Sequence, residues 1–140
     1  WKRLKGAVNW GAGVHSSFQE EWLRPALTHR ASQYLLGPTS LLEARAYMFR
    51  AKTLEEVLRL APKLSLKDQG FLDKPNAPLL LVNGKKDDQH PIDDVYMLME
   101  HGDPKDVRIY PEGGHMGREP GKPNHHVLEL ITLWVKRKLS

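Results

Sequence analysis

In the second half of the chain, segments with the apolar pattern of a strand alternate with segments that have the apolar spacing of a helix. Residues 78–82 form a continuous apolar run that ends in Asn83-Gly84, which is typical of a strand buried on both faces. A helix is predicted from Pro91, a short strand over residues 106–110, and an amphipathic helix over residues 127–139. Because strands and helices alternate, this half predicts a parallel sheet of the α/β class.

The first half of the chain predicts one further strand and a helical region. A strand is expected at residues 5–8, where a short apolar run leads into the glycine-containing segment 9–14. Helical spacing then runs from Ser17 to about residue 36, with Pro25 as a boundary or kink. A second helix, capped by Thr39 or Ser40, is expected to continue to residue 49. Thr53 and Glu56 form a capping box, so a third helix is expected to start there. The sheet then has about three strands flanked by helices, and residues 1–140 form part of one domain.

Composition and charge exclude several classes of function. No apolar run reaches the roughly 18 residues that a membrane helix needs, and no apolar signal core follows Trp1. The net charge of +4 comes from positive residues scattered among acidic ones, whereas nucleic-acid binding requires a basic stripe. We therefore expect neither a membrane nor a nucleic acid as a partner. The absence of cysteine excludes disulfides and a cysteine nucleophile and is compatible with the reducing cytoplasm, where we expect the protein to lie.

Two residues that could carry chemistry each lie just beyond a predicted strand. Asp87 follows the strand at 78–82, and His115 follows the strand at 106–110 after Gly113-Gly114. If the two strands are parallel neighbours, their loops meet at one edge of the sheet and a carboxylate–imidazole hydrogen bond can form. An Asp that orients a His is the acid–base half of a nucleophile–base–acid triad. Taken singly, an Asp in a turn or a His in a loop more often has no catalytic role.

Metal and nucleotide sites have little support in the sequence. Adjacent histidines such as His125-His126 point about 100° apart on a helix, and no His-Glu-x-x-His motif occurs. We interpret this pair as the start of the last helix. The segment Gly11-Ala12-Gly13 lacks the third glycine of a dinucleotide fingerprint because Ser16 stands in its place. We therefore predict no metal and no cofactor.

Residues 77–140 resemble the C-terminal part of an α/β-hydrolase. The similarity lies in the apolar strand, Gly84-Lys-Lys-Asp87 with Pro91 four residues later, and Gly-Gly-His115 before a closing helix. The chain is most similar to the esterase-like branch around dienelactone hydrolases, prolyl-oligopeptidase-type catalytic domains and FrsA-like hydrolases. The resemblance implies that Asp87 is the triad acid and His115 the triad base. It also implies that residues 17–71 form a helical insertion, like a lid or cap.

The nucleophile of that family has no counterpart in this sequence. The α/β-hydrolase serine lies in Gly-x-Ser-x-Gly, upstream of the acid and the base, and no such motif occurs here. The pair Ser16-Ser17 beside His15 is a weak alternative, because neighbouring residues on one loop rarely point at each other. Ser17 is more simply a helix N-cap. The remaining serines also lack a glycine elbow: Ser32, Ser40, Ser65 and Ser140.

We therefore expect a fragment or subunit of a serine hydrolase that holds the acid and the base but not the serine. Alone it should be inactive on its ester-like substrate. Its partner would be the N-terminal half of the same hydrolase or a second chain, because the strand at residues 5–8 leaves an edge that another strand must cover. A second copy of the same chain, in a homodimer, is an alternative partner. The alternative function is a non-catalytic interaction or regulatory module on a hydrolase scaffold.

Overall fold

The structure is a computed structural model that describes residues 3–28 and 41–140 and divides into two compact units. The first combines Trp1–Gly13 with Leu72–Ser140 and is called the sheet unit below. The second, Val14–Phe71, is called the helical unit. Asp87 and His115 both belong to the sheet unit.

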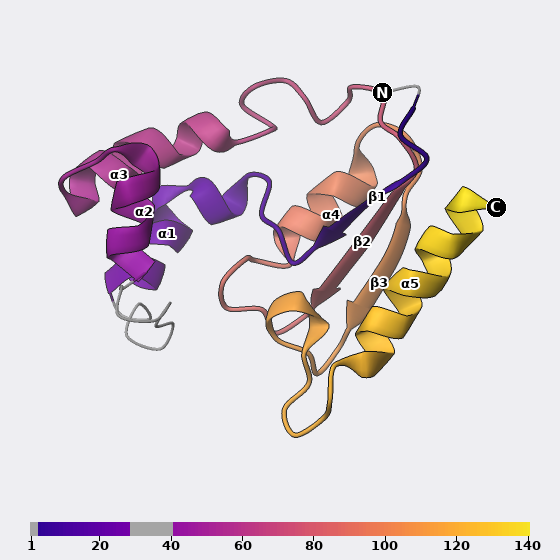
Figure 1. Cartoon of the computed structure of the whole chain (residues 1–140). Coiled ribbons are helices and arrows are strands. Elements are labelled where there is room, and N and C mark those ends of the chain that lie inside the picture. Colours follow the sequence, from indigo (N-terminus) through magenta and orange to yellow (C-terminus); the bar gives the residue numbers. More distant parts are fainter. Residues whose placement is uncertain (1–2, 29–40) are drawn as a thin grey trace. The chain divides into compact units, whose positions relative to one another are not determined.

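The sheet unit is built on three parallel strands in the order β1-β2-β3 (Figure 1). These strands are β1 (Ala7–Trp10), β2 (Leu79–Gly84) and β3 (Asp106–Tyr110). The parallel α/β sheet predicted from the sequence is confirmed. The first strand, however, lies two residues later than predicted, because Ala7 pairs with Leu79 and its N–H donates to the carbonyl of Pro78 at 2.9 Å. Register with β2, which local periodicity does not encode, decides where β1 begins.

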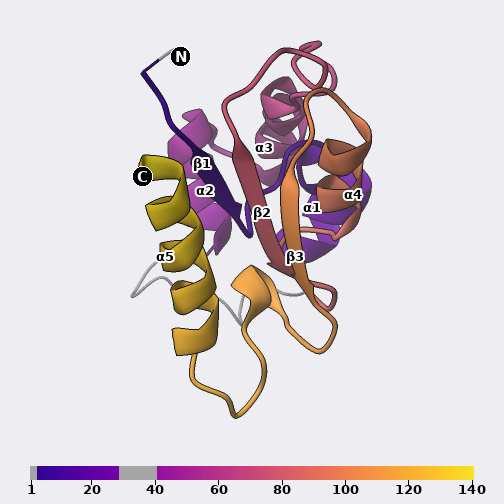
Figure 2. The same cartoon turned by 90° about the vertical axis from the view of Figure 1, so that its right-hand side faces the viewer.

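Helices α4 (Asp93–Glu100) and α5 (His125–Leu139) cover opposite faces of this sheet (Figures 1 and 2). Leu80 and Val82 of β2 pack on the α5 face in a cluster with Tyr110, Val127 and Trp134. Side chains alternate along a strand, so Leu81 and Asn83 point to the α4 face, where both are almost fully buried. The apolar run was therefore read correctly as a strand buried on both faces, and α5 begins at His125 as expected.

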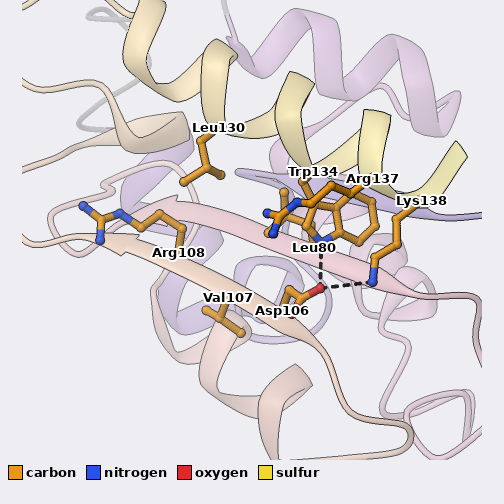
Figure 3. A pocket seen from close by; sticks show the side chains of 8 residues that line it. All are labelled: Leu80, Asp106, Val107, Arg108, Leu130, Trp134, Arg137 and Lys138. Atoms are coloured by element: carbon orange, nitrogen blue, oxygen red, sulfur yellow. Dashed lines mark hydrogen bonds and ion pairs between the residues drawn. The ribbon is translucent and has the colours of Figure 1, made fainter. Parts of the chain in front are cut away.

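A surface groove of about 400 Å³ lies between β3 and the C-terminal half of α5 (Figure 3). Asp106 accepts a hydrogen bond from Trp134 Nε1 at 2.6 Å and forms an ion pair with Lys138 Nζ at 3.5 Å. These contacts anchor α5 to the first residue of β3. His115 follows the last residue of that strand, so the groove lies at the other end of the sheet from the predicted acid–base pair.

Among the described residues, the helical unit contains α1 (Glu20–Thr28), α2 (Leu41–Phe49) and α3 (Leu54–Leu60), with two short 3-10 helices, η1 (Ser16–Phe18) and η3 (Ala61–Leu64). The third predicted helix starts as expected, because the Thr53 side chain accepts the Glu56 N–H at 3.2 Å. The role predicted for Ser17 is wrong: it is buried within η1, and α1 begins only at Glu20. The predicted extension to residue 36 and the cap at Thr39 or Ser40 lie outside the described residues. The core of this unit is formed by Leu23, Leu27, Val57, Leu58 and Ala61.

None of the helices in the described ranges is long and apolar enough to cross a lipid bilayer.

Candidate active site at the carboxyl ends of the strands

Asp87 lies in a tight turn directly after β2, with its side chain fully buried. Its Oδ1 accepts backbone hydrogen bonds from Gln89 at 2.8 Å and His90 at 3.1 Å. The following backbone therefore turns around the carboxylate and holds Oδ1 in place. The other oxygen, Oδ2, is directed toward neighbouring side chains. This local pattern is the turn that an Asp commonly stabilises, and by itself it needs no catalytic explanation.

The second oxygen of Asp87 faces the loop that follows β3. His115 Nδ1 lies 3.1 Å from Asp87 Oδ2, so the contact predicted from the sequence is present. The two residues meet because β2 and β3 are parallel neighbours and end at the same edge of the sheet (Figure 2). Both predicted site residues are thus brought together.

The direction of this hydrogen bond defines the state of the imidazole. An ionised carboxylate only accepts hydrogen bonds, so His115 Nδ1 carries the proton and, in the neutral ring, Nε2 has a free lone pair. In the described part of the chain, none of the hydrogen bonds of His115 uses Nε2. The imidazole is partly exposed, at 21% of its side-chain surface, whereas the carboxylate is fully covered. A ring held on one side and open on the other can exchange a proton with a bound molecule.

The pKa of Asp87 is lowered from its ordinary value. Burial pushes the pKa upward, but hydrogen bonds from the side chains of His115 and Asn83 and from two backbone N–H groups outweigh it. Asp87 is therefore ionised at neutral pH, which is the state that orients an imidazole and stabilises its protonated form.

This lowered pKa predicts a loss of stability in acid. An Asp has a pKa of about 3.9 in the unfolded chain, so the contribution of Asp87 to stability is fully present above that pH. It is lost as the pH falls through the lower pKa of the folded state. We expect the free energy of unfolding, measured by urea titration from about pH 6 to about pH 2, to fall less steeply in Asp87→Asn than in the wild type.

The matched control for this measurement is Asp88→Asn, which changes the neighbouring carboxylate. The buried hydrogen bonds from Asn83, Gln89, His90 and His115 go to Asp87 and are kept in this variant, so the control should reproduce the wild-type slope. An Asp87→Asn protein with an unchanged slope would contradict the stabilising role of the buried carboxylate.

The loops that carry Asp87 and His115 pack backbone against backbone. Lys86 N–H donates to the Gly113 carbonyl at 2.8 Å. A Cβ atom on Gly84 would lie 2.1 Å from the carbonyl oxygens of both Gly113 and Gly114. The approach of the two loops therefore depends on the absence of a side chain at Gly84, and this approach brings the His115 loop next to Asp87.

Sequence reasoning missed several residues that complete the site. Asn83 was expected only as the end of the apolar run, and Trp10 as an aromatic that lines a pocket or packs in the core. In the structure Asn83 hydrogen-bonds to Asp87 and Met116, and Trp10 hydrogen-bonds to Met116. Gly11 follows β1 with a φ of +66°, and a Cβ atom there would lie 3.2 Å from His115 Cε1. The Asn-Gly pair at the end of the apolar run was a usable signal for Asn83, but its partners became visible only once the strands were paired.

A second group of Ser, His and Asp residues lies in the helical unit and does not have triad geometry. His15 Nδ1 lies 2.7 Å from Ser65 Oγ and 3.8 Å from Asp68 Oδ2, so both contacts use the same nitrogen. A triad places the acid and the nucleophile on opposite nitrogens of the imidazole. Ser65 is also fully buried, and its hydroxyl accepts the Asp68 N–H at 3.0 Å. This group stabilises the turn after η3.

Across residues 3–28 and 41–140, no three His, Asp or Glu side chains are grouped so that they could hold a metal ion. A scan of the chain against protein-family models and a search of curated proteins find no match. The geometry of the Asp87–His115 pair is therefore the observation that bears on function.

Proposed function

We propose that this chain supplies the acid and the base of a serine hydrolase with an α/β-hydrolase-like sheet. The observation that carries the proposal is the 3.1 Å contact between the fully buried Asp87 carboxylate and His115 Nδ1, at the carboxyl ends of neighbouring parallel strands. His115 Nε2 is the atom that would face the reacting hydroxyl. The substrate is an ester or a related carbonyl compound.

In the proposed reaction, His115 Nε2 takes the proton of a serine hydroxyl as the serine oxygen attacks the carbonyl carbon. The resulting imidazolium returns that proton to the leaving group when the carbon–leaving-group bond breaks. Water then attacks the acyl-enzyme by the same route and releases the acid and the serine. Asp87 stays ionised throughout and keeps Nδ1–H directed toward itself, so that Nε2 is the atom that exchanges protons.

The open edge of β1 indicates where the serine-bearing segment would join. The N–H groups of Ala7 and Gly11 donate to the carbonyls of Pro78 and Val82, so the N–H and C=O groups of Val8 and Trp10 point away from β2. In the described residues β1 pairs with β2 alone. A parallel strand added here would end beside Gly11, next to the His115 ring. That strand would come from the N-terminal half of the same hydrolase or from a second chain, and it would also cover an edge that is otherwise prone to aggregation.

A fluorophosphonate probe tests this proposal, because it bonds covalently to an activated serine. We expect the natural protein that contains this chain, purified with any associated chain, to be labelled on a serine outside residues 1–140. The label should be lost in His115→Ala and retained in Asp88→Asn. Labelling of a serine within this chain would overturn the arrangement. Absence of labelling would favour the second candidate, a non-catalytic interaction module, which the missing Gly-x-Ser-x-Gly motif supports.

We also propose a cytoplasmic location, with which the lack of cysteine in this chain is compatible.

A further inference from the structure

Asn83 connects the two loops of the acid–base pair through a single buried amide. Its Nδ2 donates to Asp87 Oδ2 at 2.8 Å, and its Oδ1 accepts the Met116 N–H at 3.1 Å. The residue is only 2% exposed. Asp87 can only accept and the Met116 N–H can only donate, so the orientation of the amide is determined by its partners. Asn83 thus satisfies both neighbours in a way that few other side chains could.

Met116, which follows His115 directly, has an unusual backbone conformation. Its φ of +62° and ψ of +20° lie in the left-handed region, which is costly for a residue with a side chain. Its peptide groups are held from both sides, because Asn83 accepts the Met116 N–H and Trp10 Nε1 donates to the Met116 carbonyl at 2.8 Å. Side chains from β1 and β2 therefore stabilise the left-handed backbone conformation of Met116, in the loop that follows β3.

We infer that Asn83 is a positioning residue for the His115–Asp87 pair, and that it acts together with the Trp10 indole on the Met116 peptide. Asn83 orients the acceptor, by holding Asp87 Oδ2, and also the donor, by holding the backbone next to His115. Its effect is to keep His115 in the form that carries its proton on Nδ1 and leaves Nε2 free. The catalytic meaning of this inference rests on the function proposed above.

Other side chains at position 83 would not both donate to Asp87 and accept from the Met116 N–H. Leucine has a similar volume but would leave the Met116 N–H without its acceptor and remove one donor from Asp87. Aspartate would place a second carboxylate 2.8 Å from Asp87 Oδ2, where like charges repel. The requirement is therefore for an amide, with one donor and one acceptor at the same site.

The protonation state of His115 can be measured by ¹H–¹⁵N correlation spectroscopy of the imidazole nitrogens in the natural protein that contains this chain. We expect the neutral ring of the wild type to carry its proton on Nδ1. In Asn83→Leu, Asp87 is kept but is positioned less well, so the Nδ1–H share should fall and the Nε2–H share should rise relative to the wild type. A wild-type spectrum in a folded Asn83→Leu protein would overturn the inference.

The matched control is Asn76→Leu, the same change just before the other end of β2. Asn76 Nδ2 donates to the Ala77 carbonyl at 2.7 Å, away from His115. This control should keep the wild-type His115 spectrum. If it shifts the spectrum as much as Asn83→Leu does, a general loss of structure explains the result and the positioning role is refuted.

A second variant keeps the test decisive if Asn83→Leu does not fold. Trp10→Phe removes the indole N–H that donates to the Met116 carbonyl, together with some packing volume, and leaves the Asn83 amide unchanged. We expect a partial shift of His115 toward the Nε2–H form. An unchanged spectrum in folded Trp10→Phe would show that the Met116 peptide does not position the ring.

In the complete hydrolase, Asn83→Leu should lower kcat by about 10²-fold while KM changes by about twofold or less, since the change misplaces the base rather than the substrate. The spectrum of His115 does not depend on a nucleophile. A shifted spectrum without fluorophosphonate labelling would thus refute the proposed function but not the positioning, whereas labelling with an unshifted spectrum would refute the positioning alone.

Discussion

Replacing Asp87 by asparagine is expected to lower kcat for ester hydrolysis by the proposed hydrolase about 10⁴-fold. An asparagine amide can donate to Nδ1 of His115, which would then leave the proton on Nε2, where the base must be free. His115→Ala removes the base itself and should reduce the rate by a similar factor. The release of p-nitrophenol from a p-nitrophenyl ester measures both effects, and unfolding curves show whether each variant is folded.

The control for this prediction is Asp88→Asn. Asp88 follows Asp87 in the same turn, but it is Asp87 that accepts the four hydrogen bonds from Asn83, Gln89, His90 and His115. The Asp88→Asn substitution should change kcat by about twofold or less. An equal loss of activity from Asp88→Asn would show that the wrong carboxylate has been identified as the acid.

The substitution Gly84→Ala is expected to lower the free energy of unfolding by about 3 kcal/mol or more. Its methyl group would lie 2.1 Å from the carbonyl oxygens of Gly113 and Gly114, which are backbone atoms that cannot rotate away. The two loops would have to separate, and the hydrogen bond from Lys86 N–H to the Gly113 carbonyl would break. Urea unfolding measures the loss of stability, and the imidazole spectrum of His115 reports the loss of its contact with Asp87.

The matched control is Gly121→Ala in the loop before α5. Gly121 has a φ of +70°, but a Cβ atom there would meet nothing within 4 Å. The cost is then conformational only, about 1 kcal/mol, and the His115 spectrum should stay unchanged. If Gly84→Ala costs no more than Gly121→Ala, the close approach of the two loops does not depend on a glycine at position 84.

The elements that the sequence determined are those in which burial is encoded locally. The apolar run before Asn83 predicted a strand buried on both faces, and β3 has the predicted bounds, Asp106–Tyr110. The cap at Thr53 was also predicted correctly. In each case the residues of one strand or one turn are sufficient to predict that element. The contact between Asp87 and His115 followed from one further rule, that neighbouring parallel strands end at the same edge of a sheet.

Only the tertiary structure decided how residues from different strands meet. The start of β1 depends on its register with β2, and the start of α1 at Glu20 was not evident from helical spacing. The amide of Asn83 and the indole of Trp10 have roles only once three strands are paired around Met116. Periodicity along one segment specifies which face is buried, whereas register, close approach and hydrogen-bond partners depend on atoms that are distant in the chain.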